Sequence, residues 1–288
     1  MTSCVALIGA GGKMGSRITN NFLRTKDTAQ GTCYNVLFCE KAQEAITRLQ
    51  EKGIGITTLE EAVRRADFVV LAVPDALIGS ISSNITPFAK PGATIVLLDP
   101  AAAVVGELAI RADLNYIACH PCHPPLFFEQ PTPEARRDLF GGTAAVQDIV
   151  VALISGSEDS FEQAKELCRT MFAPVRNVHR VTIEQMAILE PAMAEVVAAS
   201  AACLMRDAME EAIKAGVPRE AAHAFMMGHA QIALAIAFEA VSSPFSDAAK
   251  VAIRWGTERI INPNWRTVFQ PEHIRAVIRE MLRPNQPQ

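Results

Sequence analysis

The chain has 288 residues, half of them apolar, and a formal net charge of −4. This length is sufficient for two domains that each bury a core. The mildly acidic balance argues against general binding to nucleic acid or to anionic membranes. No basic segment followed by a long apolar segment begins the chain, so we expect no signal peptide.

Seven cysteines are scattered along the chain, and several lie in apolar runs, where cysteine behaves as a small hydrophobic residue. Their odd number and irregular spacing are not typical of a disulfide framework. We therefore expect a reducing, cytoplasmic setting.

The first half of the chain alternates between short apolar runs and segments with helical spacing. We expect helices at 13–24 and 41–53 and strands at 4–9, 34–40, 67–74, 93–100 and 115–121. The later strands are nearly all apolar, as strands buried on both faces of a parallel sheet are. The alternation predicts an α/β protein with an N-terminal, doubly wound parallel sheet of the Rossmann type.

The first predicted strand runs directly into GAGGKMG, residues 9–15. Glycine permits a tight turn and lets the backbone approach a pyrophosphate, and the N-terminus of the next helix favours negative charge. The spacing departs from G-x-G-x-x-G, because Met14 stands at the third glycine position. A purely structural turn is the alternative. The position between a strand and a helix nevertheless predicts a dinucleotide site at Gly9, Gly11, Gly12, Lys13, Met14 and Gly15.

Two further predicted strands end in residues that could border a dinucleotide. Glu40 could accept hydrogen bonds from both hydroxyls of an adenosine ribose and would repel a 2′-phosphate, although Lys41 partly offsets that repulsion. We therefore expect a preference for NAD over NADP. Pro74 and Asp75 follow the next strand, at the sheet edge where ligands bind. A helix-capping role for Asp75 is the alternative, and both roles are compatible.

The segment ACHPCHPPLFFEQP, residues 118–131, holds two histidines and two cysteines within five residues. It follows a predicted strand, so we expect it at the same sheet edge as the cofactor. His120 and His123 could act as acid–base groups or bind a metal. We favour a functional role for His120 and a structural role for His123. No second cysteine pair has zinc-finger spacing, so we do not expect a structural zinc site.

The second half of the chain is rich in alanine, methionine and glutamate and has few strand signals. We place a boundary near residue 155, with a NAD-binding domain at 1–155 and a helical substrate and dimerisation domain at 156–288. The longest apolar stretch, 187–205, contains Glu190, Pro191 and Glu195. Two carboxylates and a proline are unfavourable in lipid, so we expect a buried helix and no membrane span.

Glu190 has apolar neighbours on both sides in the sequence. A carboxylate in such a helix is costly unless it is paired or binds a metal, and a salt bridge to an unidentified basic residue is the alternative. Glu195 lies about 140° further around an α-helix, so the two carboxylates do not readily share a site. The helices expected at 184–215 and 219–240 are apolar on more than one face, which predicts a homodimer formed through the second domain.

These motifs indicate a family. IGAGGKMGSRI resembles the nucleotide-binding turn of prephenate dehydrogenases and of 6-phosphogluconate-type dehydrogenases. ACHPCHPPLF and the long helical second half resemble the D-apionate oxidoisomerases, which join a Rossmann domain to a C-terminal domain similar to that of phosphogluconate dehydrogenase. β-Hydroxyacid dehydrogenases carry a catalytic lysine near the start of the long helix, whereas VTIEQMAILEP has Glu190 and no lysine. A histidine-proline string also serves catalysis in prephenate dehydrogenases, so that family stays an alternative.

The resemblance implies a NAD-dependent oxidation of a branched sugar acid, D-apionate, with a skeletal rearrangement to 3-oxo-isoapionate, in carbohydrate catabolism. The rearrangement needs a Lewis acid that polarises the substrate oxygens. His120 and Glu190 could hold a divalent Zn or Mg ion, so both are candidate catalytic and metal-binding residues. Without a metal, His120 would be a general base. A prephenate-type or hydroxyacid dehydrogenase without rearrangement, and a non-catalytic NAD sensor, are the alternatives.

Overall fold

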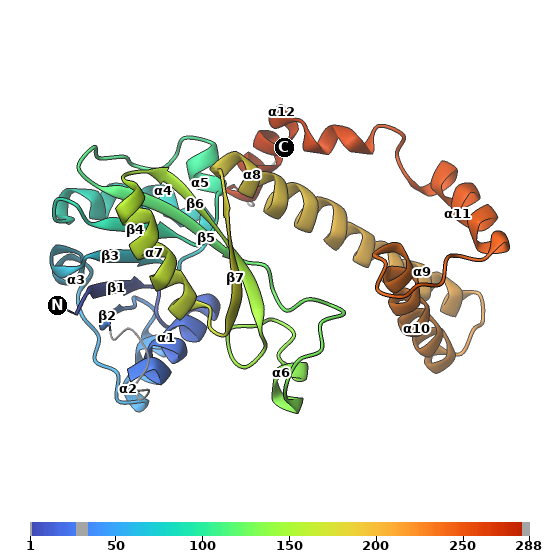
Figure 1. Cartoon of the computed structure of the whole chain (residues 1–288), viewed down its shortest axis with the longest axis horizontal. Coiled ribbons are helices and arrows are strands. Elements are labelled where there is room, and N and C mark those ends of the chain that lie inside the picture. Colours follow the sequence, from blue (N-terminus) through green and yellow to red (C-terminus); the bar gives the residue numbers. More distant parts are fainter. Residues whose placement is uncertain (1, 27–33, 284–288) are drawn as a thin grey trace. The chain divides into compact units, whose positions relative to one another are not determined.

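The computed structural model describes residues 2–26 and 34–283, which form two compact units (Figure 1). Unit 1 comprises Met1–Ala187 and Ile278–Gln288, and unit 2 comprises Ile188–Val277. The predicted combination of an N-terminal Rossmann-type sheet with a helical C-terminal part is confirmed. The units divide the chain later than the boundary expected near residue 155.

Unit 1 is built on one seven-stranded sheet in the order β2-β1-β3-β4-β5-β6-β7. The first five strands are parallel, β6 runs antiparallel to β5, and β7 runs parallel to β6. All five strands expected from the sequence are present, most of them shorter than expected. The strands are β1 (Cys4–Ile8), β2 (Asn35–Cys39), β3 (Phe68–Leu71), β4 (Thr94–Leu97), β5 (Asn115–Pro121), β6 (Gln147–Ser155) and β7 (Val175–Val181).

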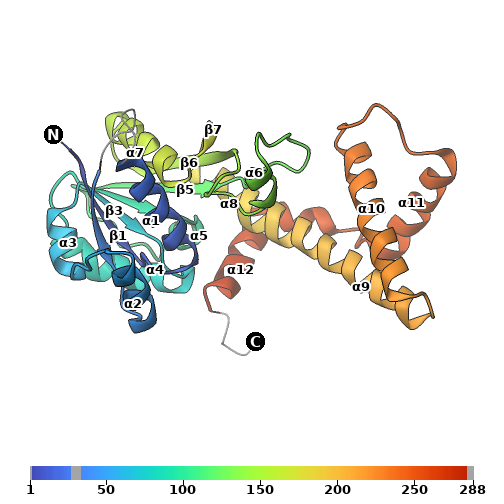
Figure 2. The same ribbon diagram turned by 90° about the horizontal axis from the view of Figure 1, so that it is seen from below.

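Helices cover both faces of this sheet (Figures 1 and 2). Helices α1 and α7 pack against each other on one face, and α3, α4 and α5 lie over the other. The side chain of Ser157 caps α7 by accepting a hydrogen bond from the amide of Ser160. The helices of unit 1 are α1 (Lys13–Lys26), α2 (Gln43–Glu51), α3 (Leu59–Arg65), α4 (Asp75–Ile85), α5 (Ala101–Val104), α6 (Pro133–Arg137), α7 (Glu158–Met171) and α8 (Ile183–Ala187).

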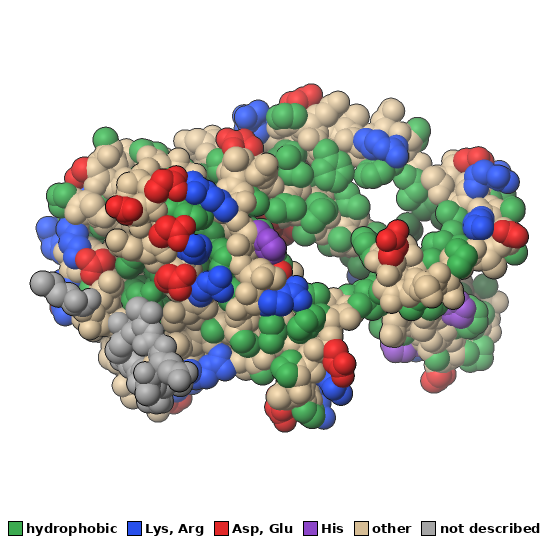
Figure 3. Space-filling model, viewed as in Figure 1, with side chains coloured by type: hydrophobic (Ala, Val, Ile, Leu, Met, Phe, Trp, Pro, Cys, Tyr) green, Lys and Arg blue, Asp and Glu red, His purple; other side chains and the backbone are tan. Residues whose placement is uncertain are grey.

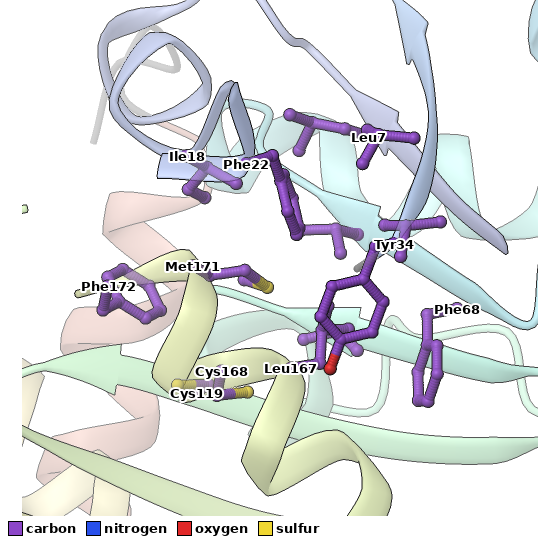
Figure 4. Packing of buried hydrophobic residues seen from close by; sticks show 14 of the residues in the cluster. Leu7, Ile18, Phe22, Tyr34, Phe68, Cys119, Leu167, Cys168, Met171 and Phe172 are labelled. Atoms are coloured by element: carbon purple, nitrogen blue, oxygen red, sulfur yellow. The ribbon is translucent and has the colours of Figure 1, made fainter. Parts of the chain in front are cut away.

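The core of unit 1 lies between the sheet and the helices α1 and α7 (Figure 4). Leu7 of β1 is fully buried, and Phe22 of α1 and Leu167 of α7 face the same cluster. Phe22 meets Tyr34 edge-on, with 5.9 Å between ring centroids. Burying one such large apolar side chain stabilises a fold by roughly 1.5–3 kcal/mol. Both α7 and β7 follow residue 155 and belong to unit 1. The first segment of this unit therefore ends at Ala187 and not near residue 155.

Unit 2 is helical and buries few of its own side chains. It contains a π-helix (Ile188–Ala199), α9 (Ser200–Lys214), α10 (Arg219–Ala237), α11 (Asp247–Ile260), a 3₁₀ helix (Trp265–Phe269) and most of α12 (Pro271–Met281). All of its residues are described, and the buried ones are Pro191, Ala192, Ala222, Ala235 and Ile274. Its apolar residues therefore contribute little to an internal core.

The apolar stretch 187–205 is mostly exposed in the single chain. Among the described residues, one continuous helical stretch, Ile183–Lys214, is long and apolar enough to cross a membrane by length and composition alone, and its most apolar window is 11% buried. The prediction of a buried helix is therefore wrong for the isolated chain. The periodicity correctly indicates apolar faces, but a sequence does not reveal whether the covering surface belongs to the same chain.

Candidate dinucleotide and histidine site

The glycine turn joins the end of β1 to the start of α1. Gly9 has φ = +81°, a left-handed conformation that favours glycine, and a side chain there would collide with the carbonyl oxygen of Ala72. Gly15 is buried, and a methyl group on it would collide with the carbonyl oxygen of Gly9. Both glycines are therefore required by close backbone approaches, which is the geometry of a dinucleotide-binding turn.

The first turn of α1 follows the glycine turn directly. Gly12 donates to the carbonyl of Gly9 (3.1 Å), and Ser16 donates to the carbonyl of Gly12 (2.8 Å). Gly12 and Lys13 are exposed, whereas Met14 is half-buried and packs against the core. The amides at a helix N-terminus and the positive end of its dipole favour a phosphate group. Met14 therefore occupies the usual third glycine position while its side chain packs against the core.

Glu40 follows β2 and binds the glycine turn directly. Its Oε2 accepts a hydrogen bond from the amide of Gly11 (2.8 Å), and its Oε1 accepts from the amides of Lys41 (2.8 Å) and Ala42 (3.1 Å). A side chain on Gly11 would collide with Ala45. The carboxylate expected to select the ribose therefore also holds the turn in place, a role that the sequence analysis missed.

The ends of β1 and β3 lie side by side where the strand order reverses. The amide of Ala72 donates to the carbonyl of Ile8 (2.9 Å), and β1 stands between β2 and β3 in the sheet. Pro74 is exposed and precedes α4, and Asp75 is the first residue of that helix and is half-buried. Ligands of open α/β sheets bind at such a reversal, so both residues border the expected cofactor crevice.

His120 lies at the carboxyl end of β5 and is half-buried. Its Nδ1 is 2.8 Å from the carbonyl oxygen of Leu98, which follows β4. A carbonyl oxygen can only accept, so Nδ1 carries a proton and Nε2 holds the lone pair of the neutral ring. This tautomer suits a general base, and metal-binding histidines commonly make the same bond to a backbone carbonyl.

His123 lies beside His120, with ring centroids 6.3 Å apart and the rings nearly perpendicular. Its Nδ1 is 2.8 Å from the carbonyl oxygen of Phe140. The structural role expected for His123 is consistent with this bond, but its position next to His120 was not anticipated.

The cysteines of the same segment are unsuited to thiolate chemistry at neutral pH. Burial raises the pKa of Cys119 well above its ordinary value, and a hydrogen bond with Cys168 adds to the effect. Burial and the nearby carboxylate of Asp148 raise the pKa of Cys122 to about 11. Protonated thiols are poor nucleophiles and poor metal ligands, which leaves the histidines as the candidate reactive groups of this segment.

Glu190 lies in the π-helix of unit 2, directly before Pro191, and is half-buried. Proline lacks an amide hydrogen, and a π-type turn accommodates that missing donor. Among the described residues, no group of three or more His, Cys, Asp or Glu side chains could hold a metal ion. The assignments of Glu190 and His120 as metal ligands stay predictions.

A polar cluster at β6 and β7 was not foreseen. The carboxylate of Asp148 accepts hydrogen bonds from Arg176 and His179 (3.0 Å each) and from the amide of Asn177 (3.2 Å). Burial alone would raise the pKa of Asp148, but these bonds lower it far below its usual value. The partners lie in another strand, so no local motif could have indicated the cluster.

Comparison with known families agrees with this architecture. Residues 4–102 match the family described as NADP oxidoreductase, coenzyme F420-dependent, and residues 128–282 match the C-terminal family of phosphogluconate dehydrogenase (decarboxylating). The first match contains the glycine turn, and the second contains all of unit 2. The resemblance of the helical part to phosphogluconate dehydrogenase is therefore confirmed.

Similar proteins match along the whole chain. A D-apionate oxidoisomerase from Blautia hydrogenotrophica is 40% identical over 99% of this chain and 98% of its own length, and one from Cupriavidus necator is 40% identical over 98% and 100%. The crystal structure of a semialdehyde dehydrogenase NAD-binding protein from C. necator, in complex with calcium and NAD, has a TM-score of 0.92 at 40% identity over 98% of this chain and 100% of its own. The chain therefore belongs to the D-apionate oxidoisomerase family.

Proposed function

We propose that this protein is a NAD-dependent oxidoisomerase that oxidises D-apionate and rearranges its carbon skeleton to 3-oxo-isoapionate in carbohydrate catabolism. One structural observation carries the proposal: the glycine turn after β1 and His120 after β5 lie at the same carboxyl edge of one parallel sheet. A cofactor and a substrate bound at this edge would meet. The 40% identity to D-apionate oxidoisomerases over nearly the full length supports this substrate over the alternative prephenate-type or hydroxyacid dehydrogenase.

Each part of the glycine turn has a role in holding NAD. The N-terminus of α1, which begins at Lys13, would bind the pyrophosphate, and the carboxylate of Glu40 would accept from the ribose hydroxyls. Bound NAD supplies the hydride acceptor. The exposed ammonium group of Lys13, in the first turn of α1, would add positive charge beside the phosphates.

His120 would handle the proton of the oxidation. As the hydride leaves the carbon that bears the 2-hydroxyl group, Nε2 takes the hydroxyl proton, and the bond from Nδ1 to the carbonyl of Leu98 fixes the ring in the required tautomer. A group on the adjacent carbon then migrates with its bonding electron pair to the new carbonyl carbon. The hydroxyl of the adjacent carbon loses its proton and becomes the ketone, and the former carbonyl oxygen gains a proton and becomes a hydroxyl. This second step makes the product an isomerised skeleton rather than the simple ketone.

We also propose that a divalent ion, Zn or Mg, assists the rearrangement by polarising substrate oxygens. The chemistry of His120 fits a ligand, since Nε2 carries the lone pair while Nδ1 donates to a backbone carbonyl. The same lone pair cannot bind an ion and take a proton at once, so His120 is the general base only where it does not hold the ion. Glu190 is the second ligand expected from the sequence. Metal analysis of the wild type and His120→Ala after gentle purification tests this idea, and an active, metal-free enzyme insensitive to chelators would refute it.

Product analysis tests the main proposal. The purified protein is incubated with NAD and a panel of branched and linear aldonic acids, NADH is followed by absorbance, and products are identified by NMR. We expect D-apionate to give NADH and a rearranged product. A simple ketone would indicate a dehydrogenase without rearrangement. Absence of NADH with every acid would indicate the non-catalytic NAD sensor instead.

We further propose a cytoplasmic homodimer formed through unit 2. Large apolar side chains on its helices are exposed in the single chain, including Phe225 (67%) and Trp255 (59%). A second copy of the same surface is the occupant that would cover them, as in obligate homodimers. Sedimentation at micromolar concentration should give a dimer. A monomer would contradict the proposal.

A further inference from the structure

His123 has a backbone conformation that is unusual for its residue type. Its φ is +60°, in the left-handed region, where residues other than glycine are uncommon. Such a conformation is strained for a residue with a side chain, and strained backbone positions cluster at functional sites. The strain places the ring of His123 beside that of His120.

A single hydrogen bond fixes the imidazole ring of His123. Nδ1 donates to the carbonyl of Phe140, so the lone pair of the neutral ring lies on Nε2, as it does in His120. The ring also packs against the ring of Phe140, with centroids 4.7 Å apart. The position of His123 therefore depends on how firmly Phe140 is held.

The segment that holds Phe140 is organised by one carboxylate. Asp138 accepts hydrogen bonds from the amides of Gly141 (3.0 Å), Thr143 (3.0 Å), Ala144 (2.8 Å) and Ala145 (3.1 Å). Burial would raise the pKa of Asp138, but these four bonds lower it below its usual value. A charged acceptor for four amides keeps this loop in one conformation.

The same segment also contacts the start of α1. The guanidinium of Arg17 lies 4.0 Å from the ring centroid of Phe140 and donates to the carbonyl of Gly141 (3.0 Å). The loop is therefore packed firmly against the helix that forms the cofactor turn.

We propose that His123 is a substrate-binding residue whose Nε2 accepts a hydrogen bond from a hydroxyl group of the polyhydroxy acid, and that Asp138 is the positioning residue that holds it through Phe140. This inference rests on the proposed function and deepens it. His120 handles the reacting proton, and His123 selects substrates that carry a second hydroxyl. An analogue without that hydroxyl would leave Nε2 of His123 without a hydrogen-bond partner. A site built to bind a hydroxyl group discriminates strongly against substrates that lack it.

The test measures substrate affinity separately from turnover. His123→Asn removes the imidazole and keeps a residue that tolerates the left-handed conformation. His123→Gly removes the imidazole and also relieves the backbone strain entirely. We expect both variants to weaken D-apionate binding to the enzyme–NADH complex, measured by calorimetry, by about tenfold or more. KM should rise more than kcat falls, and the affinity for NAD should stay within about twofold. His223→Asn, on an exposed helix, is the matched control.

Asp138 is tested by a double-variant cycle. Asp138→Asn should raise KM as His123→Asn does, and the double variant should show no further rise, because both act on the same contact. Asp113→Asn, at an exposed carboxylate paired with Arg111, is the control for lost charge.

Several results would overturn the inference. One is a His123 variant that has lower thermal stability but wild-type substrate affinity and KM. Another is an Asp138 variant that lowers the affinity for NAD and leaves the affinity for D-apionate unchanged. A wild type that binds D-apionate without converting it contradicts the proposed function, whereas the calorimetric comparison still tests His123. A wild type that neither binds nor converts D-apionate contradicts both.

Discussion

The two units of this chain bury apolar residues in different ways. In unit 1, side chains of the central strands such as Val70 and Val96 are fully buried between two layers of helices. In unit 2, apolar side chains lie on the surface of the helices, and space-filling views show hydrophobic groups exposed there (Figure 3). Unit 1 therefore has a core of its own, whereas unit 2 leaves most of its large apolar side chains exposed in the single chain.

The difference separates two tasks of the molecule. The sheet of unit 1 positions the glycine turn and the histidines with backbone contacts that a mutation would disturb directly. The helices of unit 2 leave large side chains uncovered, and each one covered in an assembly would contribute roughly 1.5–3 kcal/mol. Changes in unit 1 should therefore act on cofactor binding and chemistry, and changes in unit 2 on association.

The largest expected effect is that of Gly15→Ala in unit 1. The added methyl group would collide with the carbonyl oxygen of Gly9, so the turn must move. We expect NAD affinity to fall about a hundredfold or more and unfolding free energy to fall by roughly 1–3 kcal/mol. Calorimetry with NAD and thermal unfolding measure both. Gly55→Ala, where no atom lies within 4 Å, is the control, and equal behaviour of the two variants would contradict the assigned role of the turn.

A matched pair of charged substitutions compares the two surfaces. Val251 on α11 and Ile110 in unit 1 are similarly exposed, at 56% and 54%. Val251→Glu should shift the protein from dimer to monomer in sedimentation at micromolar concentration, because a buried unpaired carboxylate is costly at an interface. Ile110→Glu should leave association unchanged. The distinction between the units would fail if both variants stayed dimeric or both dissociated.

Asp148→Asn tests the edge of the sheet. At neutral pH it should reduce unfolding free energy by roughly 2 kcal/mol, since the carboxylate loses charge-assisted bonds to Arg176 and His179. The folded-state pKa of Asp148 is lowered, so its stabilisation is complete above the ordinary aspartate pKa and is lost as pH falls through the folded-state value. Denaturant titrations from neutral to acidic pH should therefore show the wild type and variant converging. A constant difference would contradict this origin of the stability.

The smallest expected effect concerns the choice of cofactor. Glu40→Gln keeps an acceptor for the amide of Gly11 but removes the negative charge. We expect the wild type to prefer NAD and the variant to lose about tenfold of that preference, measured as the ratio of kcat/KM for NAD and NADP. Glu44→Gln, an exposed carboxylate on α2, is the control. A wild type that prefers NADP would refute the role of Glu40.

Features encoded by adjacent residues could be predicted from the sequence. The strand at 115–121 and the start of α1 at Lys13 were both found where local patterns indicate them. The position of His120 at the end of a strand also follows from such a pattern. Each of these features depends on residues within a few positions of each other.

Features that depend on distant residues could not be predicted. Asp148 and its partners on β7, and Phe140 and Arg17 on α1, are brought together only by the sheet. The addition of β6 and β7 to the sheet likewise moves the boundary between the units beyond residue 155. The prediction that 187–205 is buried failed for a related reason. An apolar helix face indicates that a surface packs against it, but not whether that surface belongs to the same chain.

The reversal of direction at β6 affects how this scaffold can diversify. Because β6 returns antiparallel along β5, with Pro121 opposite Ile149, the segment between the two strands leaves and rejoins the sheet at the edge that carries His120. Insertions or deletions within that segment would change the surroundings of the candidate site without changing the strand register. It is therefore the natural segment in which related enzymes, or a designer, would exchange one acid for another.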